Sequence, residues 1–203
     1  FFATGGYTTA VLTTLNLSSF TDNGFLILLR KAGLLIALTD SYGRELVHLS
    51  PWVSLAAAIV ISGTLSFIIG IPVLKLKGHY LAMATLGFGM IIYHVVLGTR
   101  IFGEADGISG VPAFKIMPGL QVSGGRDFRV MNFYIAWVLV LTVVVLLKNL
   151  INSRIGRALR SIHGNEEAAN AMGVNTYRLK LTLFVMSAVM ASIAGFFMTH
   201  YNG

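Results

Sequence analysis

The sequence predicts an all-α, polytopic bundle of transmembrane helices. Of its 203 residues, 55% are hydrophobic and only 11% are charged, and the mean hydropathy is +0.76. Soluble domains carry about a quarter of charged residues, so this composition indicates an integral membrane protein. The chain has no cysteine, which excludes disulfides and cysteine-based metal sites.

Five apolar stretches predict the membrane spans. Four are close to the ~20 residues that a helix needs to cross a hydrocarbon core, and the first resembles the latter part of a span. We therefore expect a fragment of a longer protein, with a single transmembrane domain over residues 1–203 that is truncated at both ends. The predicted spans are about 1–17, 52–74, 80–97, 132–150 and 181–201.

Residues 18–51 do not have the pattern of a span. The apolar runs Phe25–Leu29 and Ala32–Leu38 are short, and Arg30-Lys31 separates them. We interpret this run as an interfacial helix. We also expect His200, near the end of the last span, to lie at the membrane interface.

The distribution of charge predicts the orientation. The turn 75–79 and the segment 148–180 together carry eight Lys and Arg against two Glu, whereas the rest of the chain carries seven basic and six acidic residues. The positive-inside rule places the first group in the cytoplasm, so we expect 151–177 inside and 99–131 outside. No basic patch is interleaved with aromatic residues, so we expect no nucleic-acid partner.

Small residues recur every four positions in two of the spans. Such stripes allow helix backbones to approach closely, and ordinary packing is the favoured interpretation. The alternative is that part of a stripe lines a transport pathway. The stripes are Ala58, Ser62, Ser66 and Gly70 in one span and Ser187, Ala191 and Gly195 in another.

The span 80–97 holds four candidates for the substrate pathway. Gly87 and Gly89 lie in its middle, after Thr85, where they indicate close packing or, alternatively, a kink or gate. His94 stands in an apolar run, where a satisfied packing residue is the simpler interpretation and a relay or a ligand is the alternative.

The polar segment 151–177 predicts two short helices between two spans. In the first, Arg154, Arg157 and Arg160 recur every three residues with apolar residues between them, which gives an amphipathic helix with a basic face that ends at Gly164.

The second helix of this segment has its own start and stop signals. Asn165 is a good N-cap, and Glu166 and Glu167 favour the first turn of a helix. Gly173 is placed to end the helix after Ala168, Ala169, Ala171 and Met172. From the residues alone, this short alanine-rich helix either faces anionic lipid or docks a soluble partner.

Several motifs resemble one family in the same order along the chain. Glu166-Glu167-Ala-Ala-Asn-Ala-Met-Gly173 resembles the EAA-type cytoplasmic loop of ABC importer permeases. Ser153-Arg-Ile-Gly-Arg-Ala-Leu-Arg160 is similar to the run before that loop in LivM-type permeases for branched-chain amino acids. Further similar segments are Gly5-Gly-Tyr7-Thr, Leu74–Ala82, Thr85–Gly89 and Asp106–Pro112.

This resemblance implies a bundle of the ABC importer permease type in the bacterial inner membrane, moving branched-chain or related amino acids. It implies as partners ABC ATPase subunits, a second, LivH-like permease subunit and a periplasmic amino-acid-binding protein, besides the lipid bilayer. The residues that the resemblance assigns to ATPase coupling are Arg154, Gly156, Arg157, Arg160, Asn165, Glu166, Glu167, Ala168, Ala169 and Gly173.

The chain has no GxxxxGK[ST] phosphate loop. We therefore expect a transport subunit that is not an enzyme and binds no cofactor itself, with ATP used by partner subunits. The alternatives are a permease for urea, a sugar or another small solute, and a secondary carrier or channel. A carrier would show ionisable groups inside its spans or broken helices at matched positions.

Overall fold

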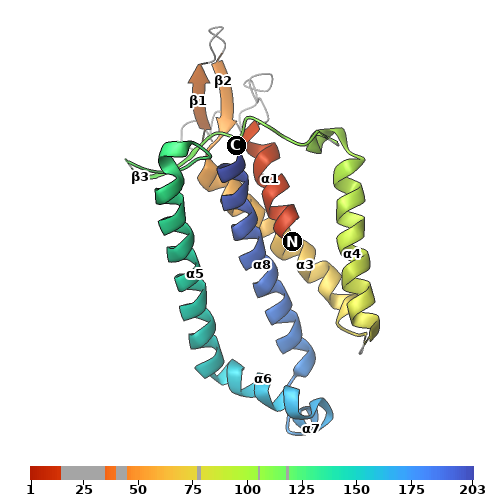
Figure 1. Ribbon diagram of the computed structural model, residues 1–203. Coiled ribbons are helices and arrows are strands. Elements are labelled where there is room, and N and C mark those ends of the chain that lie inside the picture. Colours follow the sequence, from red (N-terminus) through yellow and green to blue (C-terminus); the bar gives the residue numbers. More distant parts are fainter. Residues whose placement is uncertain (15–34, 40–44, 77–78, 105, 118) are drawn as a thin grey trace.

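A computed structural model describes residues 1–14, 35–39, 45–76, 79–104, 106–117 and 119–203. It confirms an all-α polytopic bundle, to which two short hairpins are attached (Figure 1). The helices are α1 (Phe2–Thr14), α3 (Pro51–Val73), α4 (His79–Leu97), α5 (Arg129–Asn152), α6 (Arg154–Gly164), α7 (Glu166–Ala171) and α8 (Thr176–Asn202), with 3-10 turns η2 (Arg100–Phe102) and η3 (Arg126–Phe128).

Within the described ranges, four segments are long and apolar enough to cross a membrane: α3, α4, α5 with the preceding η3, and α8. They overlap the four complete spans given by the hydropathy pattern. Helix α1 covers residues 2–14 of the remaining stretch, and residues 15–17 of that stretch lie outside the described part.

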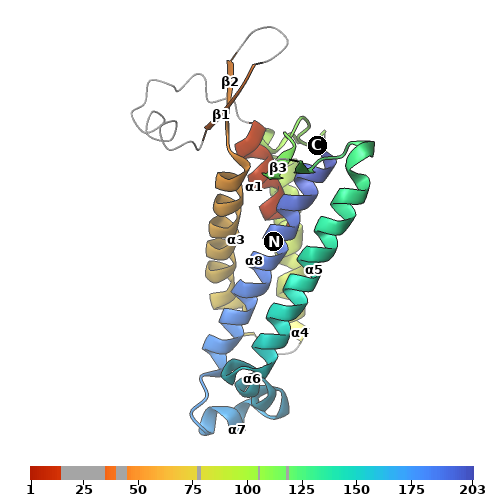
Figure 2. The ribbon, with the colours of Figure 1, turned by 90° about the vertical axis from the view of Figure 1, so that its left-hand side faces the viewer.

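Helices α1, α3 and α8 pack together as the core of the bundle, with α4 and α5 on opposite sides of them (Figures 1 and 2). The small-residue stripe of α3 makes this packing possible, as predicted. Its hydroxyls and glycine let the backbones approach closely, which is how membrane helices associate without a hydrophobic drive. The buried residues of α3 are Pro51, Ser54, Ala58, Ser62, Ser66 and Gly70.

The predicted stripe of α8 was wrong by one position. Ser187 is exposed, whereas Ala188 and Ser192 are buried. Only Gly195 of the predicted set is buried, because the backbone of α1 crosses directly over it: a Cβ on Gly195 would meet the carbonyl oxygen of Phe2. Sequence spacing identified the right kind of stripe but not the side of the helix that faces α1.

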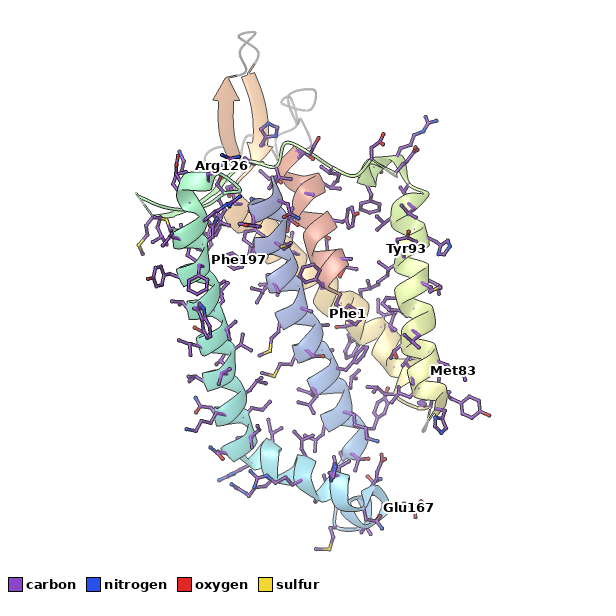
Figure 3. The ribbon with its side chains drawn as sticks, viewed as in Figure 1. Phe1, Met83, Tyr93, Arg126, Glu167 and Phe197 are labelled. Atoms are coloured by element: carbon purple, nitrogen blue, oxygen red, sulfur yellow. The ribbon has the colours of Figure 1, made fainter. Side chains whose placement is uncertain are left out.

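Helices α4 and α5 expose most of their apolar surface. Val96 is the one buried residue of α4, and α5 has none. Met83 and Tyr93, labelled in Figure 3, are both more than 60% exposed. These faces have the character of surfaces in contact with lipid or with other membrane helices.

The two ends of the bundle differ. The turn after α3 and the helices α6 and α7 lie at one end, and η2 and η3 lie at the other (Figure 1). The two basic regions therefore share an end, as the charge count requires, apart from residues 77–78, which lie outside the described part. Which end faces the cytoplasm remains a prediction.

The expected interfacial helix is wrong where the structure describes it. Strand β1 (Leu35–Thr39) pairs antiparallel with β2 (Glu45–Leu49), with Leu35 opposite Leu49. Asp, Ser and Gly in the intervening sequence are turn formers between two apolar runs, a hairpin signal that outweighs helical amphipathicity. Residues 25–34 lie outside the described part.

The loop after α4 contains a second hairpin, and His200 is buried beneath it. Strands β3 (Phe114–Met117) and β4 (Leu120–Val122) fold back over the end of α8. His200 is 1% exposed, with Nδ1 2.7 Å from the carbonyl oxygen of Pro112. The rings of Phe114 and Phe196 lie 5.6 and 4.6 Å from its imidazole, so the loop is anchored to the bundle.

Candidate functional site

The segment between α5 and α8 begins with a tight corner. Ser153 caps α6, its hydroxyl accepting a hydrogen bond of 3.3 Å from the amide of Gly156. Gly156 is buried, and a Cβ there would strike the carbonyl oxygen of Ile151, so the corner requires glycine at this position. Arg160 also donates a hydrogen bond of 3.2 Å to that carbonyl oxygen. Gly156 and Arg160, predicted to contact a partner, thus have a local role in holding the corner.

Helix α6 is amphipathic, as its sequence indicates. Arg154, Arg157 and Arg160 are exposed, whereas Leu159 and Ile162 are partly covered. The helix runs across the end of the bundle, roughly perpendicular to α5 (Figure 1). Its basic side chains therefore form a positive surface at this end.

The start of α7 has the predicted cap. Asn165 has an extended backbone, and its side-chain oxygen accepts hydrogen bonds from the amides of Glu167 and Ala168, at 2.9 and 3.0 Å. Two of the unpaired amides of the first turn are thereby satisfied. Glu166 and Glu167 occupy that turn, where negative charge favours the positive end of the helix dipole.

The end of α7 is a Schellman motif. Gly173 has φ +84°, and its amide bonds to the carbonyl oxygen of Asn170, while the amide of Val174 bonds to that of Ala169, both at 3.0 Å. A left-handed residue is required at this position, and glycine adopts it without steric cost. This confirms the stop that the sequence indicated.

One side of α7 is exposed, and two of its side chains are alanine methyl groups. Glu167, Ala168 and Ala171 lie on the surface, and Met172 beyond the last turn is 85% exposed. Ala169 is only 4% exposed, so it packs against the chain, and of the three alanines in the expected low-profile surface only Ala168 and Ala171 are available. The apolar side chain of Met172 is not covered by any part of the chain that the structure describes.

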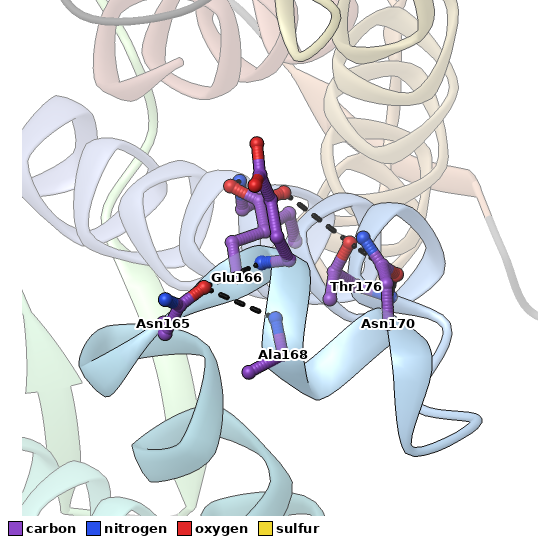
Figure 4. A network of polar contacts seen from close by, with 7 residues as sticks. Asn165, Glu166, Ala168, Asn170 and Thr176 are labelled. Atoms are coloured by element: carbon purple, nitrogen blue, oxygen red, sulfur yellow. Dashed lines mark hydrogen bonds and ion pairs between the residues drawn. The ribbon is translucent and has the colours of Figure 1, made fainter.

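The opposite side of α7 is joined to α8 by polar contacts (Figure 4). Glu166 forms an ion pair of 2.6 Å with Lys180, and Thr176 lies between Glu166 and Asn170. Asn170, Thr176 and Lys180 are not among the site residues that the sequence predicts. Their only signal in the sequence is a set of polar residues around the start of α8, which does not reveal that they meet.

The four pathway candidates are all exposed residues of α4. Thr85 donates to the carbonyl oxygen of Ala82, and His94 Nδ1 lies 2.9 Å from that of Met90, so both are satisfied within the helix. Around Gly87 and Gly89 the described chain offers no close neighbour, because an added Cβ would meet no atom within 4 Å. The described part of the chain therefore does not supply the close packing expected there.

The fold and this segment together define a class: a multi-pass permease whose membrane helices carry a capped helix between two spans. The chain belongs to the family described as branched-chain amino acid transport system / permease component, whose model matches residues 1–203. The family is one of transport permease components, and four helices in the described part of the chain are long and apolar enough to cross a membrane.

Three curated relatives illustrate the similarity. The high-affinity branched-chain amino acid transport system permease proteins LivM of Salmonella typhimurium and Escherichia coli are 35% and 34% identical over 164 residues. In each comparison 71% of this chain is covered but only 38% of the relative. The galactose/methyl galactoside import permease protein MglC of Treponema pallidum is 27% identical, covering 72% of this chain and 27% of that protein. No solved structure matches.

Proposed function

We propose that this chain is part of the permease subunit of an ABC importer that moves branched-chain or related amino acids into the cytoplasm. A periplasmic binding protein would deliver the substrate, and separate ATPase subunits would drive transport. The observation that carries the proposal is the family match over residues 1–203, together with two LivM relatives at 34% and 35% identity.

Helix α7 is the proposed docking element for an ATPase subunit. It is rigidly capped by Asn165 and ended by Gly173, and it presents the short side chains of Ala168 and Ala171. A helix with such a face can seat closely in a cleft, and the exposed Met172 adds an adaptable apolar contact. Arg154, Arg157 and Arg160 would contribute a basic rim beside it.

The other proposed partners would use other surfaces. The exposed apolar faces of α4 and α5 suit contact with a second, LivH-like permease subunit as well as with lipid. The end that holds η2 and the β3–β4 hairpin would receive the binding protein. Thr85, Gly87, Gly89 and His94 remain the proposed lining of the pathway, which requires membrane helices beyond those described.

A second candidate substrate is a sugar. The relative from Treponema pallidum, an import permease for galactose and methyl galactoside, favours it, although at lower identity than the LivM proteins. The test is uptake by the full-length protein with its partner subunits in proteoliposomes. Uptake of labelled leucine, isoleucine or valine supports the first proposal, and uptake of galactose without amino acid uptake replaces it with the second.

The docking proposal has a separate test. Ala168→Trp is accommodated by the chain itself, because the side chain is exposed, but the indole would clash with a closely packed partner. We expect the Ala168→Trp permease to insert normally and to lose its co-purifying ATPase subunits. The matched control is Met117→Trp at the opposite end, where Met117 is 67% exposed. Full retention of the ATPase by Ala168→Trp would contradict docking and favour a lipid-facing helix.

A further inference from the structure

Four polar side chains join α7 to the first turns of α8. The ammonium group of Lys180 lies 2.6 Å from Glu166 Oε2. The hydroxyl of Thr176 lies 3.2 Å from Glu166 Oε1 and 3.1 Å from Asn170 Oδ1. We call these four residues, Asn170, Glu166, Thr176 and Lys180, the α7–α8 clasp (Figure 4).

The clasp centres on a buried hydroxyl. Thr176 is 3% exposed, whereas the side chains of Lys180 and Glu166 are 34% and 39% exposed. A threonine hydroxyl donates one hydrogen, so it bonds to only one of its two acceptors at a time. The partly exposed ion pair alone would add little, but Lys180 and Thr176 contact different oxygens of the Glu166 carboxylate, and the two contacts together hold it in place.

The backbone of α8 also takes part in the clasp. The amide of Thr176, the first residue of α8, lies 3.5 Å from Asn170 Oδ1. A helix N-terminus has no internal partner for this amide, so a side chain from α7 supplies an acceptor. Only four residues, Met172–Asn175, separate the two helices, and they are fixed by the Schellman motif and by the Asn175 cap.

The far part of α8 is itself fixed to the core. Ser192 Oγ donates a 3.0 Å hydrogen bond to the carbonyl oxygen of Ala58, and Gly195 lies against the backbone of α1. By contrast, α5, at the other end of the polar segment, buries no residue. A displacement of α7 that α8 follows would therefore also reach α3 and α1.

We propose that Thr176, Lys180 and Asn170 are positioning residues: Thr176 and Lys180 of α8 bind Glu166 of α7, and Asn170 of α7 binds Thr176, so that the two helices move as one rigid body. This inference rests on the proposed function, in which a docked ATPase subunit moves α7. The docking face itself, Ala168, Ala171 and Met172, points away from the clasp. Loss of the clasp therefore leaves docking intact but lets α7 move without α8.

The test uses the full-length permease with all partner subunits in proteoliposomes. Thr176→Val removes the hydroxyl and keeps the shape of the side chain, and Thr176→Ser keeps the hydroxyl. Lys180→Met removes the charge, and Lys180→Arg keeps it. Each complex is measured for co-purifying ATPase and for substrate transported per ATP hydrolysed.

We expect Thr176→Val and Lys180→Met to retain the ATPase subunits and to lower the amount transported per ATP by about fivefold or more. Thr176→Ser and Lys180→Arg should stay close to the unmodified protein. An unchanged transport ratio in both Thr176→Val and Lys180→Met would overturn the inference. Loss of the ATPase subunits from these variants would overturn it as well, because the residues would then serve docking itself.

Failure of the proposed function has a different signature. In that outcome Ala168→Trp keeps the ATPase subunits, or the unmodified complex contains none, whatever the clasp variants do. Failure of the inference alone leaves Ala168→Trp defective in ATPase retention and the clasp variants unaffected in their transport ratio.

Discussion

The hydroxyl of Ser192 in α8 donates a 3.0 Å hydrogen bond to the backbone carbonyl oxygen of Ala58 in α3, and both residues are fully buried. A second contact, 3.1 Å between the hydroxyls of Thr4 and Ser62, joins α1 to the same side of α3. Interhelical hydrogen bonds of this kind contribute about 0.6 kcal/mol on average in membrane proteins. The stability of the α1–α3–α8 core thus depends more on the close packing of the helix backbones than on individual interhelical hydrogen bonds.

The first prediction tests close approach at Gly195. Gly195→Ala should destabilise the protein by about 1–3 kcal/mol, because the added methyl meets the backbone of α1 and no flexible side chain can move aside. The matched control is Gly63→Ala, whose Cβ would lie 3.6 Å from Val189 Cγ2, an ordinary contact. Thermal unfolding in detergent should show a lower midpoint for Gly195→Ala alone. Equal midpoints would contradict the packing described here.

The second prediction concerns orientation. His163 and Met117 are exposed at opposite ends of the bundle, and the chain has no native cysteine. With single cysteines in the full-length protein made cysteine-free, an impermeant thiol reagent applied to intact cells should label Met117→Cys. His163→Cys should react only after permeabilisation. Labelling of position 163 from outside would reverse the orientation and contradict cytoplasmic docking by α7.

The acidic residues in the turn after η2 give the third prediction. Glu104 and Asp106 are exposed in the turn after η2, and Glu104 lies 3.5 Å from Arg100 in an exposed ion pair. If a binding protein is seated there, Glu104→Lys with Asp106→Lys should raise the Kd of that protein by about tenfold or more, since repulsive charges at an interface are costly. Basal ATPase activity should not change.

The control for this prediction is charge reversal at Asp127, an exposed residue at the same end of the bundle but beside α5. An effect at Asp127 equal to that at Glu104 and Asp106 would indicate a general field effect. No effect at any of the three positions would leave this turn as a connector only.

The sequence predicts the start and the end of α7 in the candidate site, but it does not predict how α7 contacts α8. A cap such as Asn165 and a left-handed stop such as Gly173 act within a few residues, so the sequence alone predicts them. The contact between Glu166 and Lys180 joins residues fourteen positions apart on two helices, and its formation depends on the turn between them. The sequence pattern does not indicate that the side chains of Glu166 and Lys180 meet in space.

The same distinction holds for the fold. Hydropathy predicts the spans because each depends on its own composition, whereas the face of α8 that packs inward depends on where α1 crosses it. His200 illustrates this limit: its position near the end of a span does not indicate that the side chain is buried, yet the β3–β4 hairpin, which starts over eighty residues earlier, covers it. Burial created by a distant segment leaves no local pattern.

The fourth prediction tests the stop of α7 by substitution at Gly173. A Cβ there would meet no atom within 4 Å, so any penalty comes from its φ of +84° rather than from crowding. Gly173→Ala should cost roughly 1–2 kcal/mol, Gly173→Val more because its side chain is β-branched, and Gly173→Asn least because asparagine tolerates this conformation.

Gly164 supplies the matched control for Gly173, since a Cβ at that position is equally free of neighbours and its φ is not in the left-handed region. Gly164→Ala should therefore leave both stability and coupling unchanged. Amide hydrogen exchange of α7 in the full-length protein should accelerate in the order Asn, Ala, Val at position 173, and transport should fall in that order. If Gly173→Val and Gly164→Ala exchange alike, the left-handed stop does not hold α7 in place.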